Sequence, residues 1–192
     1  MTPKQVERLK KKIVAIRRHL AAEKRKFGAY DDSRGLRYFP TKYYVQLGDF
    51  TGGLTYTRWF AKNFPDDAGF PDFLFEWLII LYKTGKLREA EKKAIEVFCA
   101  DSHVFDQFLG RPSTSLEPWE AVESGTSPEL GYLRQQADLT DFAGWLAAFT
   151  TSASFQRSAH RFLDLRRQLH HEHDLEQRRH LLTLLQHVVY SI

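Results

Sequence analysis

The chain has 192 residues, of which 43 % are hydrophobic and 27 % charged, with a formal net charge of +4 and a single cysteine, Cys99. This length suits one compact domain and excludes a large multidomain machine. One cysteine cannot form an internal disulfide or a thiolate metal cage, which favours a reducing compartment. No apolar run reaches the roughly 20 residues of a membrane-spanning helix, and the charged start does not read as a secretory signal. We therefore expect a cytoplasmic protein without a membrane span.

The first predicted element is a basic amphipathic helix over residues 3 to 26, within the segment 1–27. Thr2 suits the N-cap, Pro3 suits the first helical position and Gly28 ends the helix. The segment holds ten Lys or Arg residues against two glutamates, a net charge of +8, so the rest of the chain sums to −4. Its apolar residues recur at steps of three and four and form one narrow stripe: Val6, Leu9, Ile13, Ile16 and Leu20.

After a loop that leads to Pro40, four helix-sized segments follow one another with short turns between them. They cover residues 41–47, 52–63, 72–84 and 87–100. Helices joined this tightly lie antiparallel to each other. Residues 110–130 contain three prolines and no apolar period, which predicts an extended surface loop.

Helical periodicity returns in the C-terminal region, residues 138–192. We expect helices from Thr140 to about Phe149, from Phe155 to His170, and from Asp174, as a cap, to about Tyr190. No segment alternates with period two, so the sequence predicts an all-α protein that forms one domain overall.

The middle of the chain repeats itself at an offset of 37 residues, which aligns Gly48 with Gly85, Gly53 with Ala90 and Phe60 with Val97. A glycine that ends a helix, an apolar plug two residues later and then a small residue allow two helix backbones to approach closely. This pattern resembles the tetratricopeptide repeat over residues 38–102. Residues of the two units that carry the likeness are Tyr44, Leu47, Gly48, Phe50, Gly53, Trp59, Phe60 and Pro65, then Trp77, Leu81, Gly85, Leu87, Ala90, Ala94 and Val97.

The resemblance implies two antiparallel helical hairpins in a tetratricopeptide-like α-α superhelix, with the N-terminal and C-terminal helices as caps. The chain departs from the pattern at Ser102, where a closing proline is usual, and at Thr57, where a larger apolar residue is usual. The chain also looks like the uncharacterised bacterial proteins built around such a repeat pair, a likeness that implies a fold and no activity.

A module of this kind binds a peptide or a protein on the surface lined by the leading helix of each pair. The residues that this resemblance places in the groove are Lys42, Val45, Gln46, Asp72, Phe75, Glu76, Ile79 and Lys83. The opposing interpretation is that two repeats form a shallow groove filled by the terminal helices of the chain itself. The function predicted first is a non-enzymatic adaptor or scaffold.

A second hypothesis is that the basic helix binds the phosphates of a nucleic acid. The basic patch consists of Lys10, Lys11, Lys12, Arg17, Arg18, Lys24, Arg25 and Lys26. The alternative is that these basic side chains are simply solvated. The apolar stripe of the helix then packs on the body of the protein or forms a short dimeric coiled coil, and hence a homodimer. No aromatic residue precedes Phe27, so this segment has no base-stacking platform.

Candidate chemistry is sparse elsewhere in the sequence. The cluster His170, His171, His173 and Asp174 has metal-ligand residue types without a known ligand spacing, and a solvated turn explains it better. Cys99 is expected to be a buried, inert thiol. We assign no catalytic, metal or cofactor residue. An enzyme whose site gathers residues far apart in sequence is the third hypothesis.

Overall fold

The computed structural model describes residues 1–30, 32–112 and 137–190. In these segments all regular structure is helical and no strand occurs, which confirms the all-α prediction. Most of the predicted 110–130 loop lies outside the described residues. The chain divides into two compact units, Met1–Lys86 and Leu87–Ile192, so that the boundary falls within the segment 38–102.

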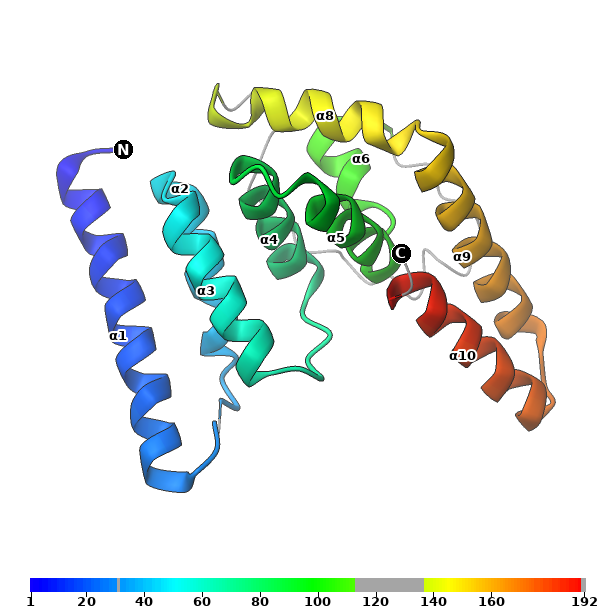
Figure 1. Cartoon of the computed structure of the whole chain (residues 1–192), viewed down its shortest axis with the longest axis horizontal. Coiled ribbons are helices and arrows are strands. Elements are labelled where there is room, and N and C mark those ends of the chain that lie inside the picture. Colours follow the sequence, from blue (N-terminus) through cyan, green and yellow to red (C-terminus); the bar gives the residue numbers. More distant parts are fainter. Residues whose placement is uncertain (31, 113–136, 191–192) are drawn as a thin grey trace. The chain divides into compact units, whose positions relative to one another are not determined.

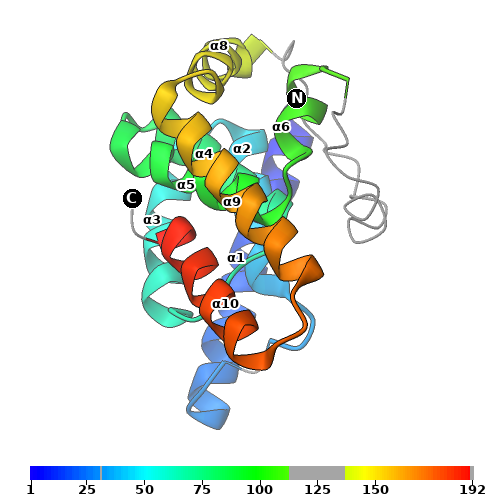
Figure 2. The same cartoon turned by 90° about the vertical axis from the view of Figure 1, so that its right-hand side faces the viewer.

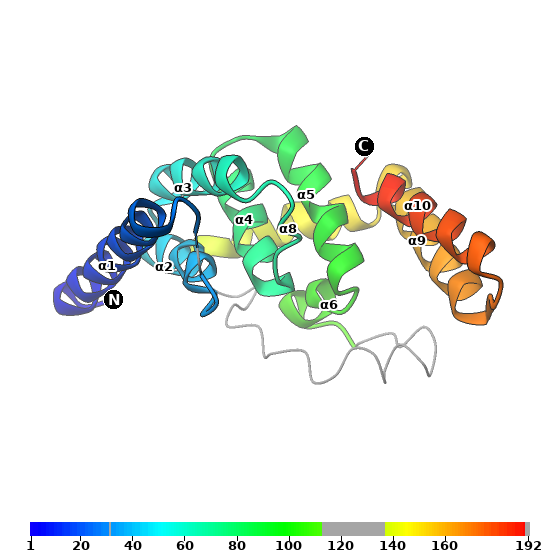
Figure 3. The same ribbon diagram turned by 90° about the horizontal axis from the view of Figure 1, so that it is seen from below.

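The described residues of the first unit form four α-helices, which agree with the predicted segments to within two residues at each end, and a short 3₁₀ helix within the predicted loop before Pro40. Its elements are α1 (Pro3–Phe27), η1 (Leu36–Tyr38), α2 (Phe39–Leu47), α3 (Phe50–Asn63) and α4 (Pro71–Lys83). Helices α2 and α3 form an antiparallel hairpin, α4 packs against both, and α1 packs along α2 (Figure 1). Figure 3 shows α1, α2 and α3 side by side.

Local sequence signals set the helix ends of this unit. The Thr2 hydroxyl accepts a hydrogen bond from the Gln5 amide at 3.3 Å, and the Gln5 side chain accepts one from the Thr2 amide at 2.8 Å. This reciprocal capping box, with Pro3 in the first turn, confirms the predicted start of α1. Gly48 and Gly85 follow α2 and α4 with φ of +67° and +71°, the left-handed conformation expected of helix-ending glycines.

The core of the first unit depends on a close approach between α3 and α4. A Cβ atom at Gly53 would lie 2.8 Å from Cδ1 of Ile80, a residue with no exposed surface. Phe60 and Phe73 continue the contact between the same helices, with ring centroids 4.7 Å apart. The small residue of the repeat pattern therefore lies where the Ile80 side chain of α4 packs directly on α3.

The second unit is also helical. Its elements are α5 (Leu87–Ala100), α6 (Val104–Leu109), η2 (Ala137–Leu139), α8 (Thr140–Thr150), α9 (Ala153–His171) and α10 (Leu175–Tyr190). Helices α9 and α10 run antiparallel, α5 packs on both, and α8 contacts α6 and α9 (Figure 2). Asp174 accepts a hydrogen bond from the Gln177 amide at 2.9 Å, as expected of a cap.

Helix α6 was not predicted. It has six residues, fewer than two turns, so its buried side chains, Val104, Phe105, Phe108 and Leu109, are too few to show a helical period. In the described parts of the chain, no helix combines the length and the apolar character that crossing a membrane requires.

Candidate functional site

A network of charged side chains holds the loop before α2. The Asp32 carboxylate accepts hydrogen bonds from the backbone amides of Leu36 and Arg37 at 2.9 and 2.8 Å. The Arg37 guanidinium then donates to Asp67, with Nε 2.7 Å from Oδ2. Asp67 precedes α4, so this pair ties the start of α2 to the start of α4.

Tyr38 completes the network from its position at the end of η1. Its hydroxyl donates to Oδ1 of Asp67 at 2.7 Å and accepts from Nη2 of Arg37 at 2.7 Å. Burial and the bond to Asp67 raise the pKa of Tyr38 to about 12. Burial alone would raise the pKa of Asp67, but its bonds from Tyr38, Arg37 and the Gly69 amide outweigh that effect and lower it. The carboxylate therefore stays ionised at neutral pH.

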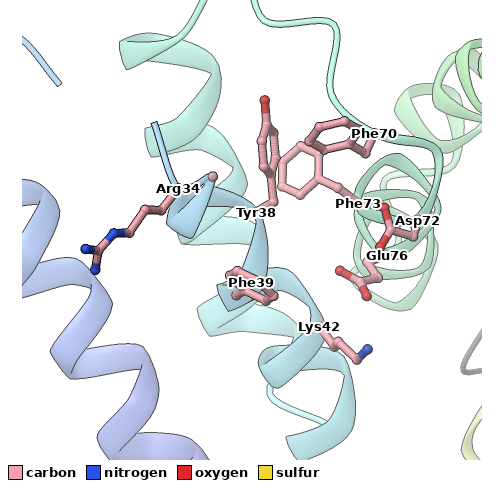
Figure 4. A pocket seen from close by; sticks show the side chains of 9 residues that line it. Arg34, Tyr38, Phe39, Lys42, Phe70, Asp72, Phe73 and Glu76 are labelled. Carbon is pink, nitrogen blue, oxygen red and sulfur yellow. The ribbon is translucent and has the colours of Figure 1, made fainter. Parts of the chain in front are cut away.

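Beside this network lies a pocket of about 200 Å³ between the start of α2 and the start of α4 (Figure 4). Its lining residues come from the loop and η1, from α2 and from α4: Arg34, Gly35, Tyr38, Phe39, Lys42, Phe70, Asp72, Phe73 and Glu76. The pocket lies wholly within the first unit.

Aromatic rings form much of the wall of this pocket. The Tyr38 ring packs edge-on against Phe70 and Phe73, with centroids 4.9 and 5.1 Å away. Phe39 and Phe70 are nevertheless 45 % and 58 % exposed, which is unusual for large apolar side chains that flank one hollow. Their rings are accessible to a ligand.

The polar side chains of the pocket come mainly from α2 and α4. Glu76 is only 3 % exposed, and its Oε2 accepts a hydrogen bond from the buried Thr41 hydroxyl at 2.7 Å. Asp72 is exposed, and its Oδ1 accepts a hydrogen bond from the Phe73 amide at 2.9 Å. Figure 4 shows Glu76 directed from α4 toward α2.

The two cations of the pocket differ in direction. Lys42 is exposed on α2 beside the pocket, whereas the Arg34 guanidinium points away from it toward α1 (Figure 4). Within the described part of the chain, Lys42 forms no ion pair. The exposed ammonium of Lys42 is therefore accessible to a polar or charged group of a ligand.

The eight residues expected in the groove separate into three groups. Lys42, Asp72 and Glu76 line the pocket together. Gln46 is exposed on α2, and the half-buried Lys83 places its ammonium 5.8 Å from the centroid of the Phe50 ring. The other three lie in the interior rather than at the surface, with 6 % exposure for one and 0 % for two: Val45, Phe75 and Ile79.

The aromatic wall of the pocket was not predicted from the sequence. A signal for it exists, because Phe39 and Phe70 each stand immediately before a proline in the first turn of a helix. That proline keeps the preceding residue at the helix start, where its side chain borders the loops. The Phe-Pro pairs do not indicate that the first turns of α2 and α4 lie next to each other, because that contact depends on the tertiary structure.

The basic patch on α1 is exposed along its whole length. The apolar stripe beneath it is partly covered: Ile13 and Leu20 are buried, the other three residues of the stripe are half-buried, and Ile13 packs in a cluster with Tyr44 and Tyr56. A dimeric coil through the same stripe would have to displace this packing.

The structure places an aromatic cluster beside the C-terminal end of α1. The Lys24 ammonium lies 4.8 Å from the centroid of the Tyr30 ring, and Tyr30 contacts Trp59 and Phe64 with centroids 5.6 and 5.0 Å away. These aromatic residues come from separate segments of the chain, which is why the helix sequence alone gives no sign of them.

The remaining candidates contribute less. Among the described residues, no group of three or more His, Cys, Asp or Glu side chains is arranged to hold a metal ion. Burial, assisted by the charge of Glu96, raises the pKa of the Cys99 thiol to about 12, which disfavours the reactive thiolate. Comparison of the chain with protein-family models, with curated proteins and with solved structures finds no match.

Proposed function

We propose that this chain is a non-enzymatic module that binds a peptide or a protein segment through the exposed surface of α2 and the first turn of α4. The observation that carries the proposal is the pocket between these helices, where exposed aromatic rings and charged side chains meet. Peptide-binding surfaces combine apolar anchors with a few oriented polar groups in this way.

The arrangement proposed for this surface is tetratricopeptide-like, with α2 and α3 as the first hairpin and α4 as the leading helix of the second. Three observations support it: the left-handed glycines Gly48 and Gly85 that follow the leading helices, the packing of α4 against both α2 and α3, and the close approach of Gly53 to Ile80. In such repeats the leading helices line the binding face.

The test is selection of binding peptides on the immobilised full chain, followed by fluorescence anisotropy with the selected peptides. Lys42→Glu and Gln46→Glu change exposed side chains of α2 and should weaken binding at least tenfold. Lys62→Glu on α3 makes the same charge change as Lys42→Glu, away from the pocket, and serves as the matched control. Equal affinities for the three variants would refute the proposal. Substitution of the buried Phe75 is unsuitable, since it would perturb the core.

A second candidate function is nucleic-acid binding by α1, and the aromatic cluster next to Lys24 is the observation that favours it. Basic side chains next to half-buried rings are the combination that binds single strands. Anisotropy of a labelled oligonucleotide should then show an affinity that falls steeply between about 50 and 200 mM salt and that Lys24→Gln with Lys26→Gln reduces. No binding at the lower salt concentration would exclude this candidate.

A further inference from the structure

We propose that α1 binds double-stranded DNA by lying in the major groove, with basic side chains directed at the phosphates on both sides of the groove. This inference rests on the second candidate function, nucleic-acid binding by α1, and specifies the form of the nucleic acid. It follows from three properties of α1: the periodicity of its cations, the arc that they cover and the small side chains between them.

The cations of α1 repeat every seven residues. Three consecutive basic positions occur at 10–12, again at 17–19 and again at 24–26, and His19 is the one member that is neither lysine nor arginine. Seven residues of an α-helix rise about 10.5 Å and complete nearly two turns, so the three triplets follow one another in almost the same orientation. They span about 21 Å, the length of about six base pairs of DNA.

Each triplet surrounds the exposed side of the helix. Successive residues of an α-helix point about 100° apart, so the three members of a triplet cover an arc of about 200°. The opposite side carries the apolar stripe, and α1 packs along α2 at the edge of the first unit (Figure 3). The middle members, Lys11, Arg18 and Arg25, therefore point away from α2, and the first and last members of each triplet flank them.

The chain itself neutralises little of this charge. All nine side chains of the triplets are exposed. Among the described residues, the triplets form two ion pairs, both within α1: Lys11 lies 4.0 Å from Glu7, and His19 lies 3.9 Å from Glu23. Exposed pairs of this kind contribute little, so the cations remain available to a polyanion.

A groove matches this distribution better than a flat surface or a single strand does. A flat lipid surface would meet the middle members of the triplets, whereas a single strand would follow one row of cations. The major groove of B-DNA is about 12 Å wide and admits an α-helix between two phosphate backbones, so all three rows of cations meet phosphate. The aromatic cluster that favours a single strand lies beside only the last triplet, at Lys24.

Small side chains separate the middle cations on the outward face. Ala15 and Ala22 are exposed and lie one turn after Lys11 and Arg18. They allow the helix backbone to approach the base edges, where an alanine methyl group can contact the methyl group of thymine. The major groove of an RNA duplex is too deep and narrow for this approach, so the inference specifies DNA.

The experiment measures fluorescence anisotropy of labelled probes with the full chain at about 50 mM salt. The probes are a DNA duplex of about 20 base pairs, which exceeds the contact length, one of its strands alone, and an RNA duplex of the same sequence. We expect the DNA duplex to bind at least tenfold more tightly than the other two. Six to eight phosphate contacts should give log K a slope of about −5 to −7 against log salt. Equal affinity for the single strand or for the RNA duplex would overturn the inference.

Variants of one flank test the groove geometry. Lys10→Gln with Arg17→Gln removes two flanking cations and should weaken duplex binding at least tenfold, with a salt slope smaller by about 2. Arg58→Gln with Lys62→Gln removes the same two residue types from exposed positions on α3 and should leave the affinity within about twofold. Equal duplex affinities of the two double variants would refute binding through both flanks. Because all four side chains are exposed and glutamine favours a helix about as strongly as lysine or arginine, circular dichroism should show both variants folded.

The inference and the candidate function on which it rests can fail separately. A single strand that binds as tightly as the DNA duplex would retain nucleic-acid binding by α1 and refute the duplex. Vesicles of equal parts phosphatidylcholine and phosphatidylserine that bind α1 while none of the three nucleic-acid probes does would refute both. Neither outcome concerns peptide binding through α2, which is tested at Lys42 and Gln46.

Discussion

The carboxylate of Asp67 should stabilise the first unit more than any exposed acidic residue does. It accepts hydrogen bonds from Nε of Arg37 at 2.7 Å, from the Tyr38 hydroxyl at 2.7 Å and from the Gly69 amide at 2.9 Å, and its side chain is only 13 % exposed. Asp67→Asn keeps the shape of the side chain but removes its charge and replaces one acceptor oxygen by an NH₂ group, which cannot accept the hydrogen bonds that Arg37, Tyr38 and the Gly69 amide donate. Hydrogen bonds to a charged group contribute about 1.5 to 3 kcal/mol each and are not additive. We therefore expect a loss of about 2 to 4 kcal/mol in the free energy of unfolding at pH 7.

Urea unfolding followed by circular dichroism and tryptophan fluorescence measures this loss. The neighbouring Asp66 is exposed, so Asp66→Asn is a matched control with an expected effect below about 0.5 kcal/mol. Because the folded pKa of Asp67 is lowered from 3.8, its contribution is present above about pH 4 and disappears as the pH falls through the folded pKa. The difference between wild type and Asp67→Asn should therefore be constant above about pH 5 and shrink below about pH 4. A difference equal to that of the control, or one that widens in acid, would refute this reasoning.

Three further predictions concern single residues. Gly53→Ala should lower the free energy of unfolding in urea by about 1 to 2 kcal/mol, because the new Cβ would meet the fully buried Ile80. Gly144→Ala should instead raise it by about 0.5 to 1 kcal/mol, because alanine favours helix α8 and nothing lies within 4 Å of the new Cβ. The pKa of Tyr38 rises from 10.0 to about 12 on folding, so its contribution to stability should be lost as the pH rises from 10 through 12, and Tyr38→Phe should lack this part of the alkaline loss in pH-dependent unfolding. Cys99 should react with a disulfide reagent at pH 8 at least tenfold more slowly in the native chain than in urea, because burial raises its pKa to about 12.

The sequence predicted the parts of the fold that local interactions determine. The capping box at Thr2 and the left-handed glycines that end helices involve residues only a few positions apart, so their patterns are visible along the chain. The apolar period of each long helix gave its position to within two residues for the same reason. Helix α6 was not predicted because six residues are too few to show a helical period of apolar side chains.

The candidate site was predicted only in part, because its residues come together through tertiary contacts. Lys42, Asp72 and Glu76 were identified from their expected positions on leading helices, but the same reasoning selected Phe75 and Ile79, which the structure buries completely. A repeat pattern specifies which helix lines a face and leaves open which side chains on that helix are covered by neighbouring elements.

The pocket and the Asp67 network share Tyr38, and this leads to a final prediction. The hydroxyl of Tyr38 binds Asp67, while its ring packs against Phe70 and Phe73 in the pocket wall. Asp67 itself does not line the pocket, so Asp67→Asn should act on a bound peptide only by loosening this ring. We expect it to weaken binding of the selected peptides about threefold or more, and to broaden the amide signals of Gly35. An unchanged dissociation constant in a variant that is measurably less stable would show that the network holds the loop without positioning the pocket.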